Sequence, residues 1–244
     1  MSIQRQDIHN SNIPVLCRSC EARHKGICGA LTEAQLISLS KSTNRKLADH
    51  GAELIVAAVP VTSYANIISG IVKLSKLLED GRQQIVGLQY APDFLGRPLR
   101  KESLVTAEAA TNVELCVFPK SALERLMAES PELEHKLLEQ SLTELDEARE
   151  WMVTLGRKTA QEKIASFLHM IAVHLDPEAD FDLGQARAFD LPLSRADIAD
   201  FLGLTIETVS RQLTKLRKAG VVSIETNRHI TVPSLDRLNE VAGT

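Results

Sequence analysis

The pattern of apolar residues and glycines changes at Pro119, and this change limits the possible folds of the chain more than any other feature of its sequence. Between residues 30 and 118, short apolar runs are broken by glycines, and residues 70–88 have the pattern of a hairpin that turns at Asp80 and Gly81. Several short strands separated by turn residues predict a sandwich or a barrel. The following stretch, 120–155, contains no glycine, which favours helix.

A repeat of apolar and small residues runs through the helical stretch. Ser130 is a suitable N-cap and Pro131 takes the first helical position, so a long helix is expected from there until Gly156. The repeat alternates spacings of three and four residues through Leu138, Ser141, Leu145, Ala148, Met152 and Leu155. Such a seam covers a core or joins two helices in a dimer. The dimer is favoured, because a helix between two domains has little else to pack on.

Shorter segments complete the expected order of elements. The first 29 residues are polar and irregular, and a short helix capped by Thr32 is expected over 32–40. Residues 157–174 should form a further helix, and a loop is expected over 176–190. The apolar face of that further helix consists of Ile164, Phe167, Leu168 and Ile171.

The stretch 191–232 combines two short helices and a hairpin. Ser194 caps the first helix, Gly203 forms a tight turn, and Thr205 caps a second helix that runs to about Ala219. Two helices joined by a short glycine turn are typical of a helix-turn-helix. The runs VVSIE and HITV follow, and they predict a small wing of two strands.

The second of these helices has two distinct faces. The apolar side chains expected to face the core are Ile206, Val209, Leu213 and Leu216. Glu207, Ser210 and Arg211 share another face in the N-terminal half, the part of such a helix that meets base edges in a major groove. Arginine can donate two hydrogen bonds to guanine, glutamate can accept one from cytosine, and serine suits either base edge. The pattern therefore favours a DNA reader over a helical pair that only packs.

Positive charge gathers around this helix. The whole chain has a formal net charge of −4. From Thr205 to Arg228, five basic side chains against two acidic ones give a local net charge of +3. Basic side chains neutralise phosphates, so a DNA backbone is expected to lie here. The five are Arg211, Lys215, Arg217, Lys218 and Arg228.

Four cysteines form a second candidate site. Cys17, Cys20 and Cys28 have the spacing C-x2-C-x7-C, and Cys116 lies in the distant run VELCVF. The N-terminus lacks the apolar core of a signal peptide, and no apolar run of 18 residues occurs, so a cytoplasmic protein without a membrane span is expected. Thiols stay reduced there, which favours metal ligands over disulfides.

The spacing of the cysteines leaves the kind of site open. Four thiolates suit tetrahedral zinc or an iron–sulfur cluster, and spacing alone does not choose between the two. Cys116 lies in an alternating strand, where it could be only a small buried hydrophobe. His24, inside the cysteine loop, is an alternative fourth ligand.

The run 195-RADIADFLGLTIETVSRQLTKL-216 resembles the helix-turn-helix of the cyclic-AMP receptor protein and Fnr superfamily of bacterial transcription regulators. The pattern Glu207-x-x-Ser210-Arg211 is similar to that of the Fnr branch, in which these three residues read a TTGAT-type half-site. Upstream, Gly70-x-Val72-Lys73, Asp80-Gly81-Arg82 and Ile85-Val86-Gly87 resemble the β-roll of the superfamily. The resemblance covers roughly residues 15 to 240.

The resemblance implies an α+β architecture with a jelly-roll-like β-roll, a long dimerisation helix and a C-terminal winged helix-turn-helix. The implied parts are a cluster-binding segment at 1–29, the β-roll at 30–118, the dimerisation helix at 119–155 and the DNA-binding domain at 156–244. The implied dimer contacts are Leu138, Leu145, Ala148, Met152 and Leu155. The implied DNA contacts are Thr205, Glu207, Thr208, Ser210, Arg211, Lys215 and Arg217.

The resemblance also implies a cofactor and partners. Fnr proteins bind a [4Fe–4S] cluster through three N-terminal cysteines and a fourth in the roll, and the seven-residue gap looks most like that of the FnrL group of alphaproteobacteria. The implied protein responds to oxygen and binds palindromes of the type TTGAT-N4-ATCAA as an anaerobic homodimer. It activates or represses transcription with RNA polymerase as a partner. A zinc-stabilised regulator without oxygen sensing is the alternative.

Two further expectations concern what the chain does not bind or catalyse. Cyclic-nucleotide binders of the superfamily carry Gly-Glu and then Arg-Ser or Arg-Thr. Here Gly96 is followed by Arg97, and Thr106 is preceded by Val105, so no cyclic nucleotide is expected. The sequence contains no glycine-rich phosphate loop, HExxH or nucleophile elbow, so no enzyme is expected.

Overall fold

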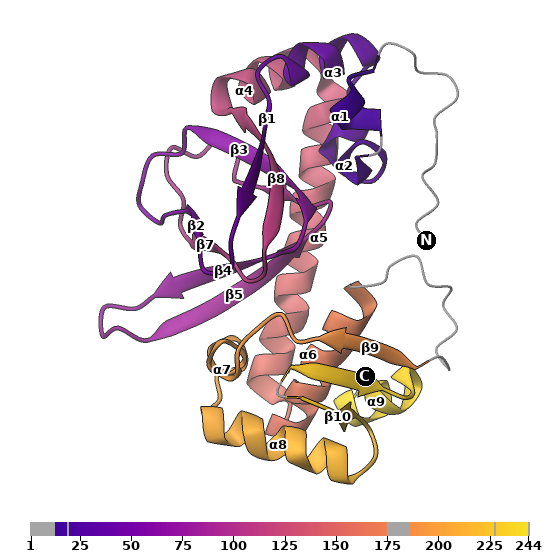
Figure 1. The fold of residues 1–244 in the computed structure, drawn as a ribbon. Coiled ribbons are helices and arrows are strands. Elements are labelled where there is room, and N and C mark those ends of the chain that lie inside the picture. The colour runs from indigo at the N-terminus through magenta and orange to yellow at the C-terminus, as the bar shows by residue number, and fades with distance from the viewer. Residues whose placement is uncertain (1–12, 19, 175–185, 227, 244) are drawn as a thin grey trace. The chain divides into compact units, whose positions relative to one another are not determined.

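The computed structural model of the chain describes residues 13–18, 20–174, 186–226 and 228–243 (Figure 1). It divides into two units. The first contains the described residues up to Lys76 together with Val86–Leu145. The second contains Leu77–Ile85 and the described residues from Asp146 onward. None of the described helices is long and apolar enough to cross a membrane.

Two antiparallel sheets form the β-roll of the first unit (Figure 1). One sheet has the order β1-β8-β3-β6, with bounds Asn44–Ala48, Val113–Pro119, Ser63–Ser69 and Phe94–Leu95. The other has the order β2-β7-β4-β5, with bounds Glu53–Ile55, Thr106–Ala109, Ile71–Leu77 and Gln83–Tyr90. The hairpin of β4 and β5 turns where it was predicted, with the Asp80 carboxylate accepting from the Arg82 backbone N–H at 3.0 Å.

Alternation along the strands gives the first sheet two different faces. Ala65 and Ile67 of β3 face the second sheet and join an apolar cluster with Val72 and Ala107. Tyr64, on the opposite face of β3, belongs to another cluster that includes Phe118 and residues of the helices. The helical segments of this unit therefore cover the outer face of the first sheet at β3 and the end of β8, whereas Leu47 on β1 is 79% exposed.

The N-terminal segment is helical in short turns, where irregular structure was expected. These turns are α1 (Val15–Arg18), α2 (Glu21–His24) and the 3-10 helix η1 (Ile27–Ala30). Four residues are too few to show a helical period in sequence, but Ala22 and Ile27 are each only 1% exposed. The following helix α3 (Glu33–Ser40) is capped as predicted, since the Thr32 hydroxyl accepts from the Gln35 N–H at 3.4 Å.

The helical stretch after Pro119 consists of two helices. They are α4 (Lys120–Glu129) and α5 (Pro131–Arg157), with Ser130 as the break between them. The Ser130 hydroxyl accepts from the Leu133 N–H at 3.4 Å, as expected of an N-cap. The prediction that the helix ends at Gly156 is wrong, because α5 includes Gly156 and ends at Arg157. A glycine costs a helix only about 1 kcal/mol relative to alanine, so a long helix can continue past it.

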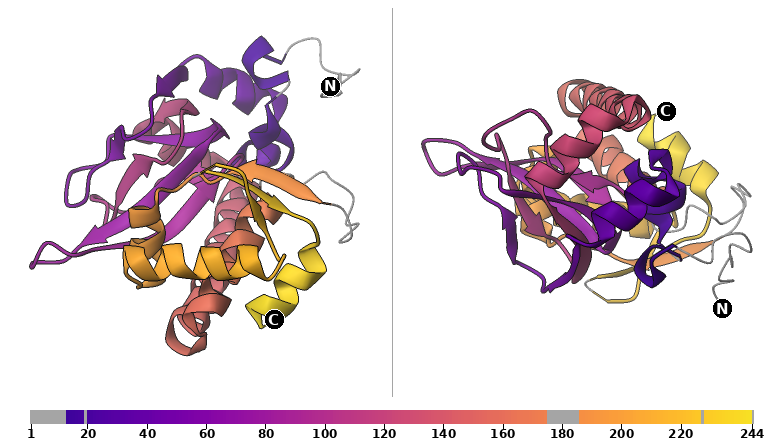
Figure 2. Two further views of the ribbon diagram at one scale, coloured as in Figure 1. Left: turned by 60° about the horizontal axis from the view of Figure 1, so that its bottom comes forward. Right: turned by 90° about the horizontal axis from the view of Figure 1, so that it is seen from above.

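Besides the last part of α5, the second unit contains four helices and a three-stranded sheet of order β10-β11-β9 among its described residues. The four are α6 (Ala160–His174), α7 (Arg195–Leu202), α8 (Ile206–Lys218) and α9 (Leu235–Ala242). The strands are β9 (Arg187–Asp190), β10 (Ser223–Ile224) and β11 (His229–Val232). In the left view of Figure 2, α8 lies in gold across the front of this unit, with the wing strands beside it.

Two elements of the second unit differ from the expected order. Residues 187–190, placed in a loop from sequence, form β9, in which Phe189 pairs with Ile230 of β11. Four residues of mixed character give too little alternation to indicate a strand, and the rest of the expected loop, 175–185, lies outside the described residues. Helix α9 was not anticipated, although Ser234 caps it and Leu235 and Leu238 share its buried face.

Candidate functional site

Strand β8 places Cys116 on the outer face of the first sheet. Its neighbours Leu115 and Val117 pack with the inner cluster between the sheets, so Cys116 points the other way, as Phe118 does. Cys28, in η1, packs against the same outer cluster as Phe118. The fold thus brings the third and fourth cysteines of the sequence to one side of one sheet.

The strands beside β8 supply the immediate surroundings of Cys116. Its direct cross-strand neighbours are Arg45 on β1 and Asn66 on β3. Asn66 is 1% exposed, and its Nδ2 donates a hydrogen bond to the Sγ of Cys28 at 3.2 Å. Asn66 therefore links the cysteine of the N-terminal segment to the strand position next to the cysteine of the roll.

The four thiols lie close enough together for the charge of one to raise the pKa of another. Burial raises the pKa of Cys28, and the neighbouring Cys116, Cys20 and Cys17 raise it further. Burial also raises the pKa of Cys116 to about 12, with additional contributions from Cys20 and Cys17 and a lowering one from Arg45. A thiol whose ionisation is opposed by burial and by other thiolates remains protonated until a cation compensates the charge.

The four thiols form a donor set of sulfur alone, which suits tetrahedral zinc or an iron–sulfur cluster. Among the described residues, no group of three or more His, Cys, Asp or Glu side chains is arranged to hold a metal ion. His24, the alternative ligand, is exposed and lines a separate hollow with Pro131 and His135.

The helix-turn-helix has the caps that were predicted for it. The Ser194 hydroxyl accepts from the Asp197 N–H at 3.1 Å, and the Asp197 carboxylate accepts from the Ser194 N–H at 3.1 Å. Gly203 ends α7 in the left-handed conformation at φ 61°. The Thr205 hydroxyl then accepts from the Thr208 N–H at 3.2 Å and starts α8. These contacts set the angle at which α8 leaves the turn.

One residue expected in the core of α8 is not there. Val209, Leu213 and Leu216 are buried, but Ile206 is 48% exposed. Ile206 is the first residue of the helix, and the buried face of α8 begins only one turn later, at Val209. Gln212 is buried instead, at 7% exposed, and its spacings of three residues to Val209 and four to Leu216 place it on the buried face of the helix.

The predicted DNA readers share an open surface. Glu207, Ser210 and Arg211 are exposed, and Arg211 Nη2 donates to the Thr208 hydroxyl at 3.3 Å. Hydrogen bonds from its own backbone N–H and from the Thr205 hydroxyl lower the pKa of the Glu207 carboxyl, so it is ionised and acts only as an acceptor. Thr205, Lys215 and Arg217 are exposed around them, and Thr208 is partly exposed.

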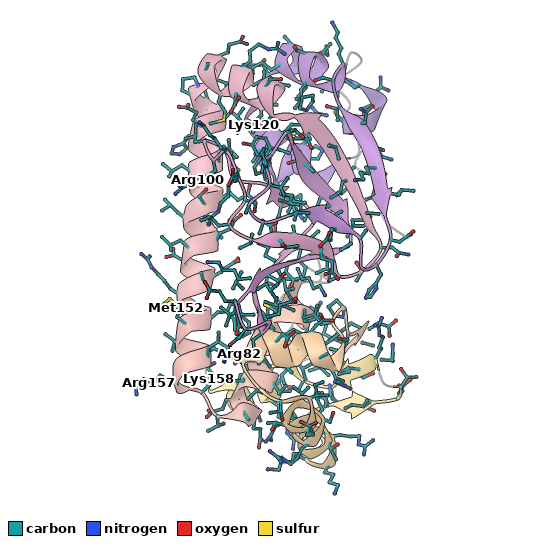
Figure 3. The ribbon with its side chains drawn as sticks, turned by 90° about the vertical axis from the view of Figure 1, so that its left-hand side faces the viewer. Arg82, Arg100, Lys120, Met152, Arg157 and Lys158 are labelled. Carbon is teal, nitrogen blue, oxygen red and sulfur yellow. The ribbon has the colours of Figure 1, made fainter. Side chains whose placement is uncertain are left out.

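Helix α5 carries an exposed apolar stripe. The predicted seam residues Leu138, Leu145 and Met152 are exposed by 56%, 43% and 72%, and Met152 points into open space in Figure 3. Ala148 is also exposed, whereas Leu155 is partly buried. Leu142, 52% exposed, extends the stripe beyond the predicted seam, and its spacings of four residues to Leu138 and three to Leu145 are visible in the sequence.

Comparisons with known proteins match both halves of the chain. Residues 45–130 match the cyclic nucleotide-binding domain family, and residues 162–241 match the Crp-like helix-turn-helix domain family. A probable transcriptional activator of Rhizobium leguminosarum bv. viciae is 54% identical over 99% of both chains. The chain belongs to the Crp/Fnr family of DNA-binding transcription regulators.

Other members of the Crp/Fnr family agree in sequence and in fold. The transcriptional activator protein FnrL of Cereibacter sphaeroides is 40% identical over 93% of this chain and 92% of its own length. The structure of FixK2 from Bradyrhizobium japonicum, 30% identical, superposes with a TM-score of 0.72 over 82% of this chain and 96% of that chain. The expected architecture is therefore confirmed, as is membership of a family of regulators and not of enzymes.

Proposed function

We propose that the chain is an oxygen-responsive transcription regulator that holds a [4Fe–4S] cluster on Cys17, Cys20, Cys28 and Cys116. The observation that carries the proposal is the grouping of thiols from two segments far apart in sequence, with Asn66 bonded to Cys28 and paired in register with Cys116. When bound, the cluster supplies an oxygen-labile link between the N-terminal segment and the roll.

The residues of the chain then have separate tasks. Cys28 and Cys116 are partly buried, and Arg45 places positive charge near Cys116 and Cys17, which offsets part of the charge of ligated thiolates. Strand β8, which carries Cys116, ends at Pro119 and is followed directly by α4 and α5. The chain thus runs from Cys116 through the end of β8 and helix α4 to α5, the helix that carries the exposed stripe.

We infer that the stripe on α5 is the seam of a homodimer. Leu138, Leu142 and Leu145 are large apolar side chains left exposed on one helix face. Burying each against a second copy contributes roughly 1.5–3 kcal/mol. A dimer would present two copies of α8 to the two halves of a palindrome about one DNA turn apart.

The proposed target is a TTGAT-N4-ATCAA palindrome, read by Glu207, Ser210 and Arg211. Their exposure and their position in the first turns of α8 support direct base contacts. Thr205, Thr208, Lys215 and Arg217 are proposed to contact DNA around them. RNA polymerase is the proposed partner for activation or repression. No cyclic nucleotide is proposed as effector, because Arg97 follows Gly96 and Val105 precedes Thr106, in place of the glutamate and arginine of cyclic-nucleotide binders.

The test of the cofactor is an anaerobic visible spectrum with iron, sulfide and zinc analysis. A broad visible absorption that bleaches in air, with about four irons per chain, is expected for four cysteine ligands of this kind. A colourless protein with one zinc per chain would favour the zinc-stabilised regulator and contradict the oxygen-sensing proposal.

A further inference from the structure

Asn66 is an unusual residue for its place in the fold. It lies in the middle of β3, in a strand whose central residues are all buried, and asparagine is disfavoured in strands. Its Nδ2 has one partner, the Cys28 sulfur, while its buried Oδ1 has no hydrogen-bond partner among the described residues. Burying a half-satisfied amide costs free energy, and an apolar residue would stabilise the sheet better.

The geometry around Asn66 points to the cysteines and not to the sheet. Three residues are paired side by side across strands β1, β8 and β3. Cys116 is the middle one, with Arg45 on one side and Asn66 on the other. The Arg45 guanidinium is engaged with Glu114 at 3.0 Å. Of the two residues paired with Cys116, Asn66 is the one that donates a hydrogen bond to a second cysteine, Cys28.

The chemistry of the contact fits a ligand sulfur. A thiolate accepts hydrogen bonds and cannot donate, so an N–H donor matches the ligand form of Cys28. Hydrogen bonds to ligand sulfurs are among the features that set the potential of iron–sulfur sites, and groups that orient a ligand change how firmly the metal is held.

We propose that Asn66 is a positioning residue of the cysteine site, whose amide holds the Cys28 sulfur beside Cys116 and slows the loss of the cofactor in air. This inference rests on the proposed function. Removing the N–H donor leaves negative charge on the sulfur less stabilised, which makes the site easier for oxygen to oxidise. Asn66 acts on the lifetime of the oxygen-sensitive state and does not ligate iron itself.

The test compares Asn66→Val with Asn66→Thr in the full chain. Valine and threonine have the same shape and both suit a strand, but only threonine carries a hydroxyl donor. Ser75→Ala is the matched control, because Ser75 is a buried polar residue, 6% exposed, in the other sheet of the roll. Each protein is assembled with iron and sulfide without oxygen, and its bleaching in air-saturated buffer is timed.

The expected result is that Asn66→Val bleaches about tenfold faster than the wild type. Asn66→Thr should fall between the two, and Ser75→Ala should match the wild type. The iron–thiolate stretching bands in the resonance Raman spectrum should shift in Asn66→Val and not in Ser75→Ala. Unchanged bleaching and unchanged bands in Asn66→Val would overturn the inference while leaving the cluster proposal intact.

Two other outcomes remain decisive. If both Asn66 variants take up no iron, the unfolding temperatures of the metal-free proteins decide whether Asn66 positions the ligand or only stabilises the fold. Wild-type temperatures would support positioning of the ligand, whereas lowered temperatures would make Asn66 a structural residue and overturn the inference. If the wild type itself takes up no iron, the proposed function fails, and the inference fails with it.

Discussion

The cysteine site and the helix-turn-helix are assembled in opposite ways. The caps and turn of the helix-turn-helix come from residues three positions apart, such as Ser194 with Asp197 and Thr205 with Thr208. At the cysteine site, Asn66 and Cys28 lie 38 positions apart, and Cys116 enters by strand pairing. A local site depends on helix geometry alone, whereas the cysteine site requires a correctly folded roll. The following changes test that difference.

The largest effect is expected from Cys116→Ala. Loss of the ligand on β8 should abolish both iron uptake and anaerobic binding to a TTGAT-N4-ATCAA duplex, because the N-terminal segment loses its link to the roll. Iron analysis and fluorescence anisotropy measure the two losses. Ser75→Ala, in the other sheet, should retain both. Full DNA binding by Cys116→Ala would mean that this cysteine is only a buried hydrophobe.

The next largest effect is expected on dimer formation, from a charge placed in the exposed stripe of α5. Leu145→Glu is expected to raise the dimer dissociation constant by at least about tenfold, since it removes one apolar contact from each copy. Analytical ultracentrifugation gives the constant. Thr143→Glu adds the same charge at another exposed position of α5 and should leave the dimer intact. Equal effects of the two changes would argue against the seam.

The DNA surface can be tested with two arginines of α8. Arg211→Ala should cost about 1–3 kcal/mol, roughly a 5- to 150-fold weaker complex, and should relax selectivity at one guanine. Arg217→Ala should weaken binding to every sequence alike and reduce the salt dependence by about one unit. Anisotropy titrations on matched and mismatched duplexes separate these outcomes. A uniform loss for Arg211→Ala would remove its role as a reader.

The smallest effects concern two glycines exchanged for alanine. Gly203→Ala should destabilise the chain by about 1–2 kcal/mol, because its φ of 61° disfavours a Cβ. Gly156→Ala should stabilise it by about 0.5–1 kcal/mol, since Gly156 is helical and a Cβ there meets no atom within 4 Å. Fluorescence of the single tryptophan, Trp151, whose ring lies 4.6 Å from that of Phe201, can follow unfolding. Effects of the same sign would contradict this account of the turn.

The same contrast explains what the sequence could predict. Caps, the Gly203 turn and the buried face of α6 follow from spacings of three and four residues, and these predictions are confirmed. Spacing indicated that the cysteines bind something, but the pairing of Asn66 with Cys116 depends on strand register, which no local pattern specifies. The four-residue segments α1, α2 and β9 are too short to show a period. Leu142 and α9 could have been found, because their apolar spacings were visible.

The central claim is that the cysteine site controls DNA binding in response to oxygen. One sample, assembled with iron and sulfide, is titrated with a labelled TTGAT-N4-ATCAA duplex without oxygen and again after exposure to air, with iron measured each time. We expect tight binding before exposure and loss of both iron and binding after it. Equal affinity before and after iron loss would contradict the account.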